Sequence, residues 1–413
     1  MSKDRQASLR HGEPLGRRER DQARPEAVNK VVISDKAEAG SAAGLLSGCH
    51  HKRKPAPVFR ETDMKLKERV LRRLNGQEVD MTPVGSTTTY GCVAFMKRCG
   101  VTRPEVDSDP QALALMAIAG HTVGGFDWIR AMGSDITAAS ELLGCKVHSP
   151  APDAPYAIAS HPCEHGDVDG LDCPDDLLSR GRMPAYREQF RILKAKFGKD
   201  LAIYGASEGP FTCAANLMDA APLMKAAIEA PGKVEKVMAV TTETLIRMIR
   251  FAAGEGADYY CLAEPSSTPA LLSPKYWDRF VGPYIRKIVD SVPCPVVLHI
   301  CGQTAPIIRS MCGTGVAGIS IEEKMDMQSA VRIAHAMGVK VFGNVSTAAT
   351  LFSGTPEECR AEAMAALAAG TDFLCPGCGI DPNSPLDNVL QMRLSRDEKF
   401  GQPKFTPAER VVL

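Results

Sequence analysis

Residues 296–302 read Val-Val-Leu-His-Ile-Cys-Gly, an apolar run that ends with a histidine and a cysteine two positions apart. A short apolar run of this kind is typical of a buried β-strand. Because side chains alternate between the two faces of a strand, we expect His299 and Cys301 to point the same way. An imidazole and a thiolate that share one face at a strand end are typical ligands of zinc.

A second apolar run far downstream ends in Cys375-Pro376-Gly377-Cys378-Gly379. If the two strand ends meet, they supply one histidine and one or two thiolates, a set too soft for magnesium or calcium. Cys378 lies in the loop beyond the predicted strand, whereas Cys375 is nearly within it, so we favour Cys378 as the third ligand and keep Cys375 as the alternative. Three protein ligands leave a position at zinc where an incoming thiol would be deprotonated.

Strand and helix patterns alternate along most of the chain. The strand candidates are Thr82–Ser86, Phe126–Arg130, Leu201–Tyr204, Asp258–Leu262, Val296–Ile300, Ala317–Ile321, Lys340–Phe342 and Asp372–Leu374. Eight strand–helix repeats predict an α/β protein with a closed (β/α)₈ TIM barrel. A Rossmann fold is the alternative, but no strand candidate is followed by G-x-G-x-x-G.

Composition narrows the class of partner and the compartment. The 413 residues carry 49 Lys+Arg and 49 Asp+Glu, so a net charge of zero gives no signal for nucleic acid or a membrane surface. No apolar run reaches the length of a membrane span, and no signal peptide opens the chain. The 14 cysteines are scattered, as in proteins of a reducing compartment. We therefore expect a cytoplasmic protein.

The first 63 residues differ from the rest, being rich in Arg, Glu, Ala, Gly and Ser with little apolar periodicity. We expect residues 1–63 to be a disordered or appended segment and residues 64–413 to form the barrel. Within the first segment, Cys49-His50-His51 is not accompanied by a second group of Cys or His residues at a spacing typical of metal sites. We therefore interpret it as part of a solvated tail and not as a metal site.

In such barrels the chemistry lies at the C-terminal ends of the strands. Glu208, Glu264 and Glu322 each follow a strand candidate. Each is a candidate catalytic carboxylate, serving as the fourth zinc ligand, as a proton acceptor from a thiol, or as a group that orients the zinc-binding histidine. The alternative for each is a solvated loop carboxylate.

Three further residues are candidate cofactor contacts. Ser86 and Asn344 follow strand candidates, and His121 lies on a largely apolar helix near residues 110–124. For His121, a hydrogen-bonded core histidine is the alternative.

Several short motifs lie between Met64 and about Arg396. They are Thr82-Pro83-Val84, Arg180-Gly181-Arg182, Glu208-Gly209-Pro210, Leu298-His299-Ile300-Cys301-Gly302, Glu322-Glu323-Lys324, Gly343-Asn344-Val345 and Pro376-Gly377-Cys378-Gly379-Ile380. With these motifs the sequence resembles the methylcobamide:coenzyme M methyltransferases of methylotrophic methanogens, members of the uroporphyrinogen decarboxylase-like superfamily. The resemblance implies a (β/α)₈ barrel in which His299, Cys301 and Cys378 hold the zinc that activates the coenzyme M thiol, and it favours Cys378 over Cys375.

The resemblance also implies a reaction, in which a methyl group passes from a methylated corrinoid to the thiol of coenzyme M and cob(I)alamin departs. The chain contains no Asp-x-His-x-x-Gly motif, so we expect the corrinoid to arrive on a partner protein and residues 134–175 to admit it. Arg180 and Arg182 are candidate donors to the coenzyme M sulfonate, with surface ion pairs as the alternative.

Other functions remain as alternatives. A zinc-dependent corrinoid methyltransferase with another thiol acceptor, such as homocysteine, keeps the same chemistry. Two further alternatives lack this chemistry. They are a metal-free uroporphyrinogen-type decarboxylase and a non-catalytic partner of a corrinoid protein. Residues 85–90 read Gly-Ser-Thr-Thr-Thr-Tyr and lack the arginine that the decarboxylases carry after the first strand, which argues against porphyrinogen decarboxylation.

Overall fold

Seven parallel strands form one curled sheet in the order β1-β4-β5-β6-β7-β8-β9 in the computed structural model, which describes residues 64–151 and 153–413. The strands are β1 (Trp128–Arg130), β4 (Ala202–Glu208), β5 (Tyr259–Ala263), β6 (Val296–His299), β7 (Gly318–Ser320), β8 (Lys340–Val345) and β9 (Phe373–Pro376). Spatial order follows chain order, and the predicted α/β class with a parallel sheet is confirmed. The expectations for residues 1–63, including Cys49-His50-His51, lie outside the described residues.

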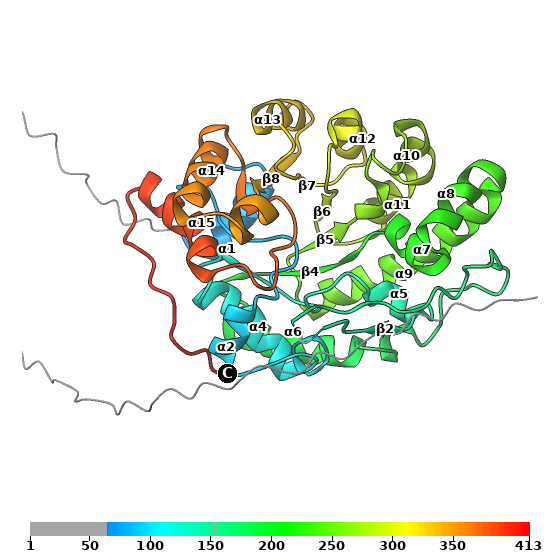
Figure 1. The fold of residues 1–413 in the computed structure, drawn as a ribbon, viewed down its shortest axis with the longest axis horizontal. Helices are drawn as coiled ribbons and strands as arrows, with labels where there is room; N and C mark the ends of the chain where they lie inside the picture. The colour runs from blue at the N-terminus through cyan, green and yellow to red at the C-terminus, as the bar shows by residue number, and fades with distance from the viewer. Residues whose placement is uncertain (1–63, 152) are drawn as a thin grey trace, which may run out of the picture. The chain divides into compact units, whose positions relative to one another are not determined.

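Helices precede, connect and follow the strands and lie outside the sheet, as Figure 1 shows for the succession from β4 to β8. They are α1 (Leu66–Leu74), α2 (Val93–Cys99), α3 (Glu105–Ser108), α4 (Pro110–Thr122), α5 (Ala138–Leu142), α6 (Met183–Phe197), α7 (Pro210–Met218), α8 (Ala220–Glu229), α9 (Pro231–Glu255), α10 (Pro274–Phe280), α11 (Gly282–Ser291), α12 (Ile308–Gly313), α13 (Met327–His335), α14 (Pro356–Ala368) and α15 (Leu386–Lys399). A helix between consecutive parallel strands is the connection that such strands require. No described helix is long and apolar enough to cross a membrane.

The first strand candidate, Thr82–Ser86, forms only one parallel bridge, between Val84 and Leu374 of β9. The Gly85 amide donates to the Leu374 carbonyl at 3.0 Å, and the Asp127 amide donates to the Val84 carbonyl at 2.8 Å. The segment therefore lies between β9 and the start of β1. The expectation of eight full strands is corrected to seven strands and a bridge, because Pro83 has no amide hydrogen to extend the ladder.

Two apolar layers lie on the two faces of the sheet. The inner layer includes Trp128, Tyr204, Cys261, Phe342 and Phe373, whereas Ile129 packs in the outer layer under the helices. The alternation along β1 is that of a strand with both faces buried. The inner layer fills the interior of the curled sheet below the C-terminal ends of the strands. Those C-terminal ends are left for polar side chains.

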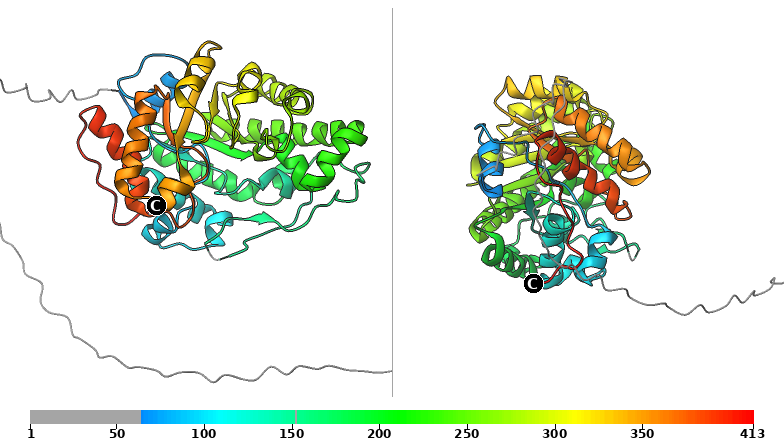
Figure 2. Two further views of the ribbon diagram at one scale, coloured as in Figure 1. Left: turned by 45° about the horizontal axis from the view of Figure 1, so that its top comes forward. Right: turned by 90° about the vertical axis from the view of Figure 1, so that its left-hand side faces the viewer.

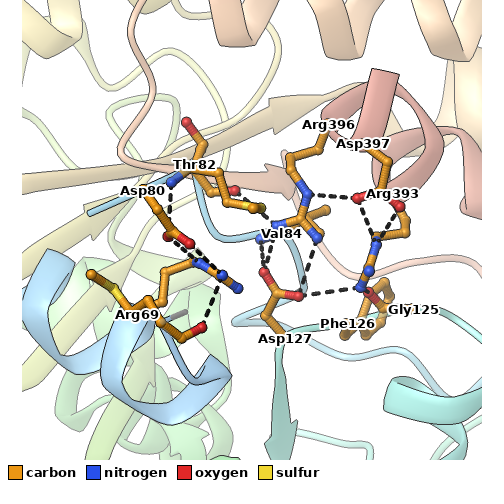
Figure 3. Close-up of polar contacts among 12 residues, drawn as sticks. Arg69, Asp80, Thr82, Val84, Gly125, Phe126, Asp127, Arg393, Arg396 and Asp397 are labelled. Carbon is orange, nitrogen blue, oxygen red and sulfur yellow. Dashed lines mark hydrogen bonds and ion pairs between the residues drawn. The ribbon is translucent and has the colours of Figure 1, made fainter. Parts of the chain in front are cut away.

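A polar network joins α15 to the N-terminal end of the sheet (Figure 3). The buried carboxylate of Asp127 accepts from Arg396 Nη1 at 2.8 Å and from Arg393 Nη1 at 3.3 Å. Asp397 bonds both arginines, and Arg396 also donates to the Thr82 carbonyl at 3.2 Å. Burial opposes ionisation of Asp127, but the two guanidinium groups lower its pKa below the ordinary value. The network therefore ties the last helix to the segment beside β1.

The C-terminal segment runs along the first helices, where the Ala408 amide donates to Thr122 of α4 and the Val411 amide to Arg98 of α2. Figure 2 shows the last two helices, α14 and α15, side by side. The hydrogen bonds of Ala408 and Val411 lie away from the C-terminal ends of the strands.

Apart from α5, the described residues between 134 and 175 form a largely irregular excursion after β1, in a stretch whose sequence contains five prolines. It contains a small antiparallel pair, β2 (Val147–His148) with β3 (Ala157–Ile158). Between the two strands, Pro155 and Tyr156 reach the cavity described next. The excursion therefore forms part of the wall above the sheet.

Candidate metal centre

Three side chains from two distant parts of the chain converge at the C-terminal end of the sheet. His299 ends β6, Cys301 follows two residues later, and Cys378 follows β9. One ligand atom of each, a ring nitrogen or a sulfur, lies within 4.8 Å of the others. The structure thus brings together the three residues that were predicted as zinc ligands.

The alternative ligand, Cys375, lies elsewhere. Its side chain is completely buried in the inner apolar layer with Phe373, and burial raises the pKa of its thiol well above the ordinary value. A thiol in such surroundings is inert. Among the described residues, the group with metal-ligand geometry contains Cys378 and not Cys375.

The loop that carries Cys378 depends on its two glycines. A Cβ atom on Gly377 would lie 2.8 Å from Oε2 of Glu323, and one on Gly379 would lie 2.2 Å from Oγ1 of Thr89. Only glycine permits such close approach. From the other side, Thr88 Oγ1 donates to the Cys378 carbonyl at 2.7 Å. These contacts hold the thiol over the end of the sheet.

The histidine ring is oriented by a neighbouring strand. His299 is 3 % exposed, and its Nδ1 atom lies 3.0 Å from Oγ of Ser320, its register partner on β7. Engagement of one ring nitrogen leaves Nε2 for a metal and sets the ring plane. Sequence reasoning missed Ser320. The signal that identifies it is the pairing of β6 with β7, which places the last residue of β7 beside His299.

The two ligand thiols contact each other. Hydrogen bonding with Cys378 lowers the pKa of Cys301, and the same contact together with burial raises the pKa of Cys378 to about 12. Cys301 is therefore the more readily ionised of the two thiols, and both sulfur atoms lie within 4.8 Å of each other and of a ring nitrogen of His299, so the three converge on one point. A cation at that point would deprotonate both thiols.

The three residues line a cavity of about 270 Å³ at the mouth of the curled sheet. The other lining residues are Thr87, Thr88, Thr89, Arg130, Ser134, Asp135, Ile136, Pro155, Tyr156, Ala206, Ser207, Cys261, Ala263, Pro265 and Gly379. This space suits a small molecule and not a large cofactor.

The three candidate carboxylates occupy different environments. Glu322 lies beside Cys301, where Oε2 accepts from the Gly302 amide and Oε1 lies 3.0 Å from Lys324 Nζ. Gly302 has φ of +85°, so this turn requires glycine. Glu322 therefore holds the turn that follows Cys301.

Glu264 binds the N-terminus of helix α7. Its two oxygens accept from the amides of Phe211 and Thr212, each at 2.8 Å. A carboxylate is favourable at this position because the first amides of a helix lack backbone partners. Burial nevertheless raises the pKa of Glu264 to about 7. Glu264 does not line the cavity.

Glu208 is also buried outside the cavity. Its Oε1 accepts from the Ser140 amide at 2.8 Å and from Ser140 Oγ at 2.7 Å, and Oε2 has no partner among the described residues. Burial raises the pKa of Glu208 to about 7. Glu208 and Glu264 therefore lie near the C-terminal end of the sheet, as predicted, but their side chains contact the surrounding elements and do not line the cavity.

The predicted cofactor contacts do not line the cavity either. Ser86 accepts from the Thr88 amide at 3.2 Å within its own loop, while Thr87–Thr89 face the cavity. Asn344 donates to the carbonyls of Glu322 and Met325, at 3.2 and 3.0 Å, beside a separate hollow. His121 Nδ1 bonds the Phe126 carbonyl at 2.7 Å, at the N-terminal end of β1 and hence at the opposite end of the sheet.

Comparison with known proteins identifies the family. The family model described as uroporphyrinogen decarboxylase (URO-D) matches residues 65–398. The methylcobamide:CoM methyltransferase MtaA of Methanosarcina barkeri is 33 % identical, over 82 % of this chain and 99 % of the relative. MtbA of Methanosarcina mazei, with the same description, is 30 % identical, over 80 % of this chain and 97 % of its own.

A solved structure supports the same family assignment. A methyltransferase from Methanosarcina mazei superposes with a TM-score of 0.79 and 34 % identity, covering 82 % of this chain and 100 % of its own. The chain belongs to the methylcobamide:CoM methyltransferases of the uroporphyrinogen decarboxylase family. It is therefore a methyltransferase.

Two arginines of this methyltransferase that were candidate sulfonate donors are engaged elsewhere. Arg180 is exposed and pairs with Asp176 at 2.6 Å. Arg182 is buried and pairs with Asp135 at 2.5 Å and with Glu141 at 2.8 Å. Neither lines the cavity.

The arginine that does line the cavity of the methyltransferase is Arg130, which sequence reasoning had treated only as the end of a strand. The available signal was its position, two residues after Trp128 and therefore on the inner face of β1. Arg130 is 3 % exposed.

Proposed function

We propose that this enzyme is a zinc-dependent methyltransferase that moves a methyl group from a methylated corrinoid protein to the thiol of coenzyme M. The observation that carries the proposal is the convergence of His299, Cys301 and Cys378 on one wall of a small cavity. The printed descriptions of the relatives, methylcobamide:CoM methyltransferases, agree with a corrinoid donor and this acceptor.

The residues present suit zinc. One imidazole nitrogen and two sulfurs within 4.8 Å of one another are a donor set that zinc accepts in tetrahedral sites. Three protein ligands leave a fourth position for a substrate, which is the arrangement of catalytic rather than structural zinc. When bound, zinc would supply the positive charge that keeps the acceptor thiol deprotonated at neutral pH.

The protein positions the reacting sulfur. Ser320 orients His299, Glu322 holds the turn after Cys301, and Thr88 holds the Cys378 loop. The acceptor thiolate then attacks the methyl carbon in line. A carbon–sulfur bond forms while the cobalt–carbon bond breaks, and its electron pair stays on the corrinoid as cob(I)alamin. Of the three candidate carboxylates, Glu322 is the one we assign to the site.

The corrinoid is proposed to arrive on a partner protein, because the cavity of about 270 Å³ is far smaller than a corrinoid. The excursion over residues 134–175 contributes Tyr156 and Pro155 to the cavity rim. We propose this rim as the face that meets the partner. All described cysteines are free, which supports our proposal of a cytoplasmic location.

We also propose that the curled sheet is a closed (β/α)₈ barrel formed by residues 64–413. The support is the segment that contains Val84, which bonds to β9 on one side and to Asp127 on the other. Closure brings the last strand beside the first and places all strand ends around one mouth.

The test is incubation of the purified protein with methylcobalamin and a panel of thiols, following loss of the methyl–cobalt absorbance and measuring bound zinc. We expect one zinc per chain and turnover with coenzyme M. Cys301→Ser should lose zinc and activity, whereas the control Cys294→Ser, half-buried and outside the metal group, should keep both. Turnover with homocysteine but not coenzyme M would select the alternative acceptor, and activity without zinc would refute the metal role.

A further inference from the structure

A buried arginine lies in the same cavity as the metal ligands. Arg130 ends β1, and its side chain lies on the same face of the strand as Trp128, toward the inside of the curl. Only 3 % of its surface is exposed. Arginine is almost never buried to this degree unless its charge is compensated.

No carboxylate pairs with Arg130 within the part of the chain that the structure describes. Its Nη2 atom donates to the backbone carbonyl of Asp135 at 2.8 Å, and its Nε atom has no partner there. The nearby carboxylate of Asp135 is already held by Arg182, at 2.5 and 3.2 Å. The positive charge of Arg130 is therefore left for something that enters the cavity.

Arg130 and the metal ligands reach this cavity from different strands of the sheet. Arg130 ends β1, whereas His299 ends β6, Cys301 follows β6 and Cys378 follows β9. All four nevertheless line one space of about 270 Å³. A molecule bound there can touch the thiolate side with one end and the guanidinium with the other.

We propose that Arg130 binds the anionic group of the acceptor thiol and so selects a short molecule with a thiol at one end and a sulfonate or carboxylate at the other. A guanidinium matches either anion with two parallel hydrogen bonds. The proposal rests on the proposed methyl transfer and deepens it, because it names the acceptor's second recognition group and the residue that reads it.

The first experiment needs neither metal nor catalysis. Ethanesulfonate and propionate, which carry the anion without a thiol, are titrated by calorimetry into wild type, Arg130→Gln and Arg130→Lys. We expect wild type to bind one of the anions, Arg130→Gln to lose at least about tenfold in affinity, and Arg130→Lys to fall between. Arg180→Gln, an exposed arginine outside the cavity, is the matched control and should bind as wild type does.

The second experiment measures methyl transfer from methylcobalamin to coenzyme M, to 3-mercaptopropionate and to the uncharged 2-mercaptoethanol. Arg130→Gln should raise KM for the preferred anionic thiol by about 10- to 100-fold and change KM for 2-mercaptoethanol by less than about threefold. The preferred anionic thiol distinguishes a sulfonate from a carboxylate. If Arg130→Gln does not fold by circular dichroism, Arg130→Lys carries the test with about a tenfold effect.

The proposal is overturned if folded Arg130 variants bind the anions like wild type, or if KM for charged and uncharged thiols rises equally. Such a result with zinc and turnover intact would leave the proposed function standing. Conversely, Arg130-dependent anion binding in a wild-type protein that transfers no methyl group would retain the anion site and refute the methyl transfer.

Discussion

The Nδ1 atom of His299 lies 3.0 Å from the hydroxyl oxygen of Ser320 on the adjacent strand. The two residues are register partners on β6 and β7, and both are buried. This contact decides which ring nitrogen faces the two cysteines, and it is the only described hydrogen bond that holds the imidazole from the side away from the thiols.

Ser320→Ala should therefore weaken zinc binding, because the ring of His299 loses its orienting partner. We expect about a 10- to 100-fold loss of zinc affinity, measured by competition with a chromogenic chelator. Ser329→Ala, half-buried on α13 and outside the metal group, is the control and should bind zinc as wild type does. Equal affinity of Ser320→Ala and wild type would show that the hydroxyl does not position the ligand.

Gly379→Ala should displace the Cys378 loop, because the added methyl group would lie 2.2 Å from Oγ1 of Thr89. We expect at least about a tenfold loss of zinc affinity. A second substitution, Thr89→Ala, removes the clashing oxygen and should restore part of the affinity. Gly254→Ala in α9, where a Cβ meets nothing within 4 Å, should leave zinc binding unchanged. Absence of rescue by Thr89→Ala would contradict the steric explanation.

Asp127→Asn should destabilise the fold without touching the metal site. It removes the charge that compensates the buried Arg396 and the adjoining Arg393, at the N-terminal end of the sheet. We expect about 3–5 kcal/mol less free energy of unfolding, measured with urea. Glu188→Gln, at a half-exposed position on α6 whose partner is the surface residue Arg191, should change it by less than about 1 kcal/mol. Zinc content of folded Asp127→Asn protein should equal that of wild type, and a loss there would argue against a purely structural role.

Glu264 should make stability depend on pH. Burial raises its pKa in the folded protein to about 7 from an ordinary value of 4.5, so the folded state binds the proton more tightly. Its contribution is fully present below about pH 4.5 and is lost as the pH rises through 7. Relative to wild type, Glu264→Gln should thus gain roughly 2–3 kcal/mol between pH 4.5 and 8 in urea unfolding. If the difference in unfolding free energy between Glu264→Gln and wild type stays constant across this range, the pKa of the Glu264 carboxyl is not raised.

Much of the metal centre was predictable because it depends on local spacing. The histidine and cysteine two residues apart on a strand had to share a face, and Cys378 lay in a loop just past another strand. The parallel α/β class followed in the same way, from repeated strand and helix periods. The family resemblance agreed with the relatives that were found.

The errors and omissions concern groups whose role depends on long-range contacts. Glu264 and Glu322 both follow strands, yet one binds the amides of α7 and the other holds the turn after Cys301. Thr82–Ser86 was expected as a full strand, but its neighbours allow only one bridge. Nothing local in the sequence distinguishes the two carboxylates, whereas Pro83, which has no amide hydrogen, is the local cause of the single bridge.

The amino-acid sequence alone determined the ligand types, the alternation that aligns His299 with Cys301 and the repeated strand–helix order, because these depend on residues close together in the chain. Tertiary structure decided that Cys378 and not Cys375 joins them, that Ser320 orients the imidazole and that Arg130 faces the same cavity. The physical reason is that those relationships are set by strand register and sheet curvature, which bring together residues separated by tens to hundreds of positions.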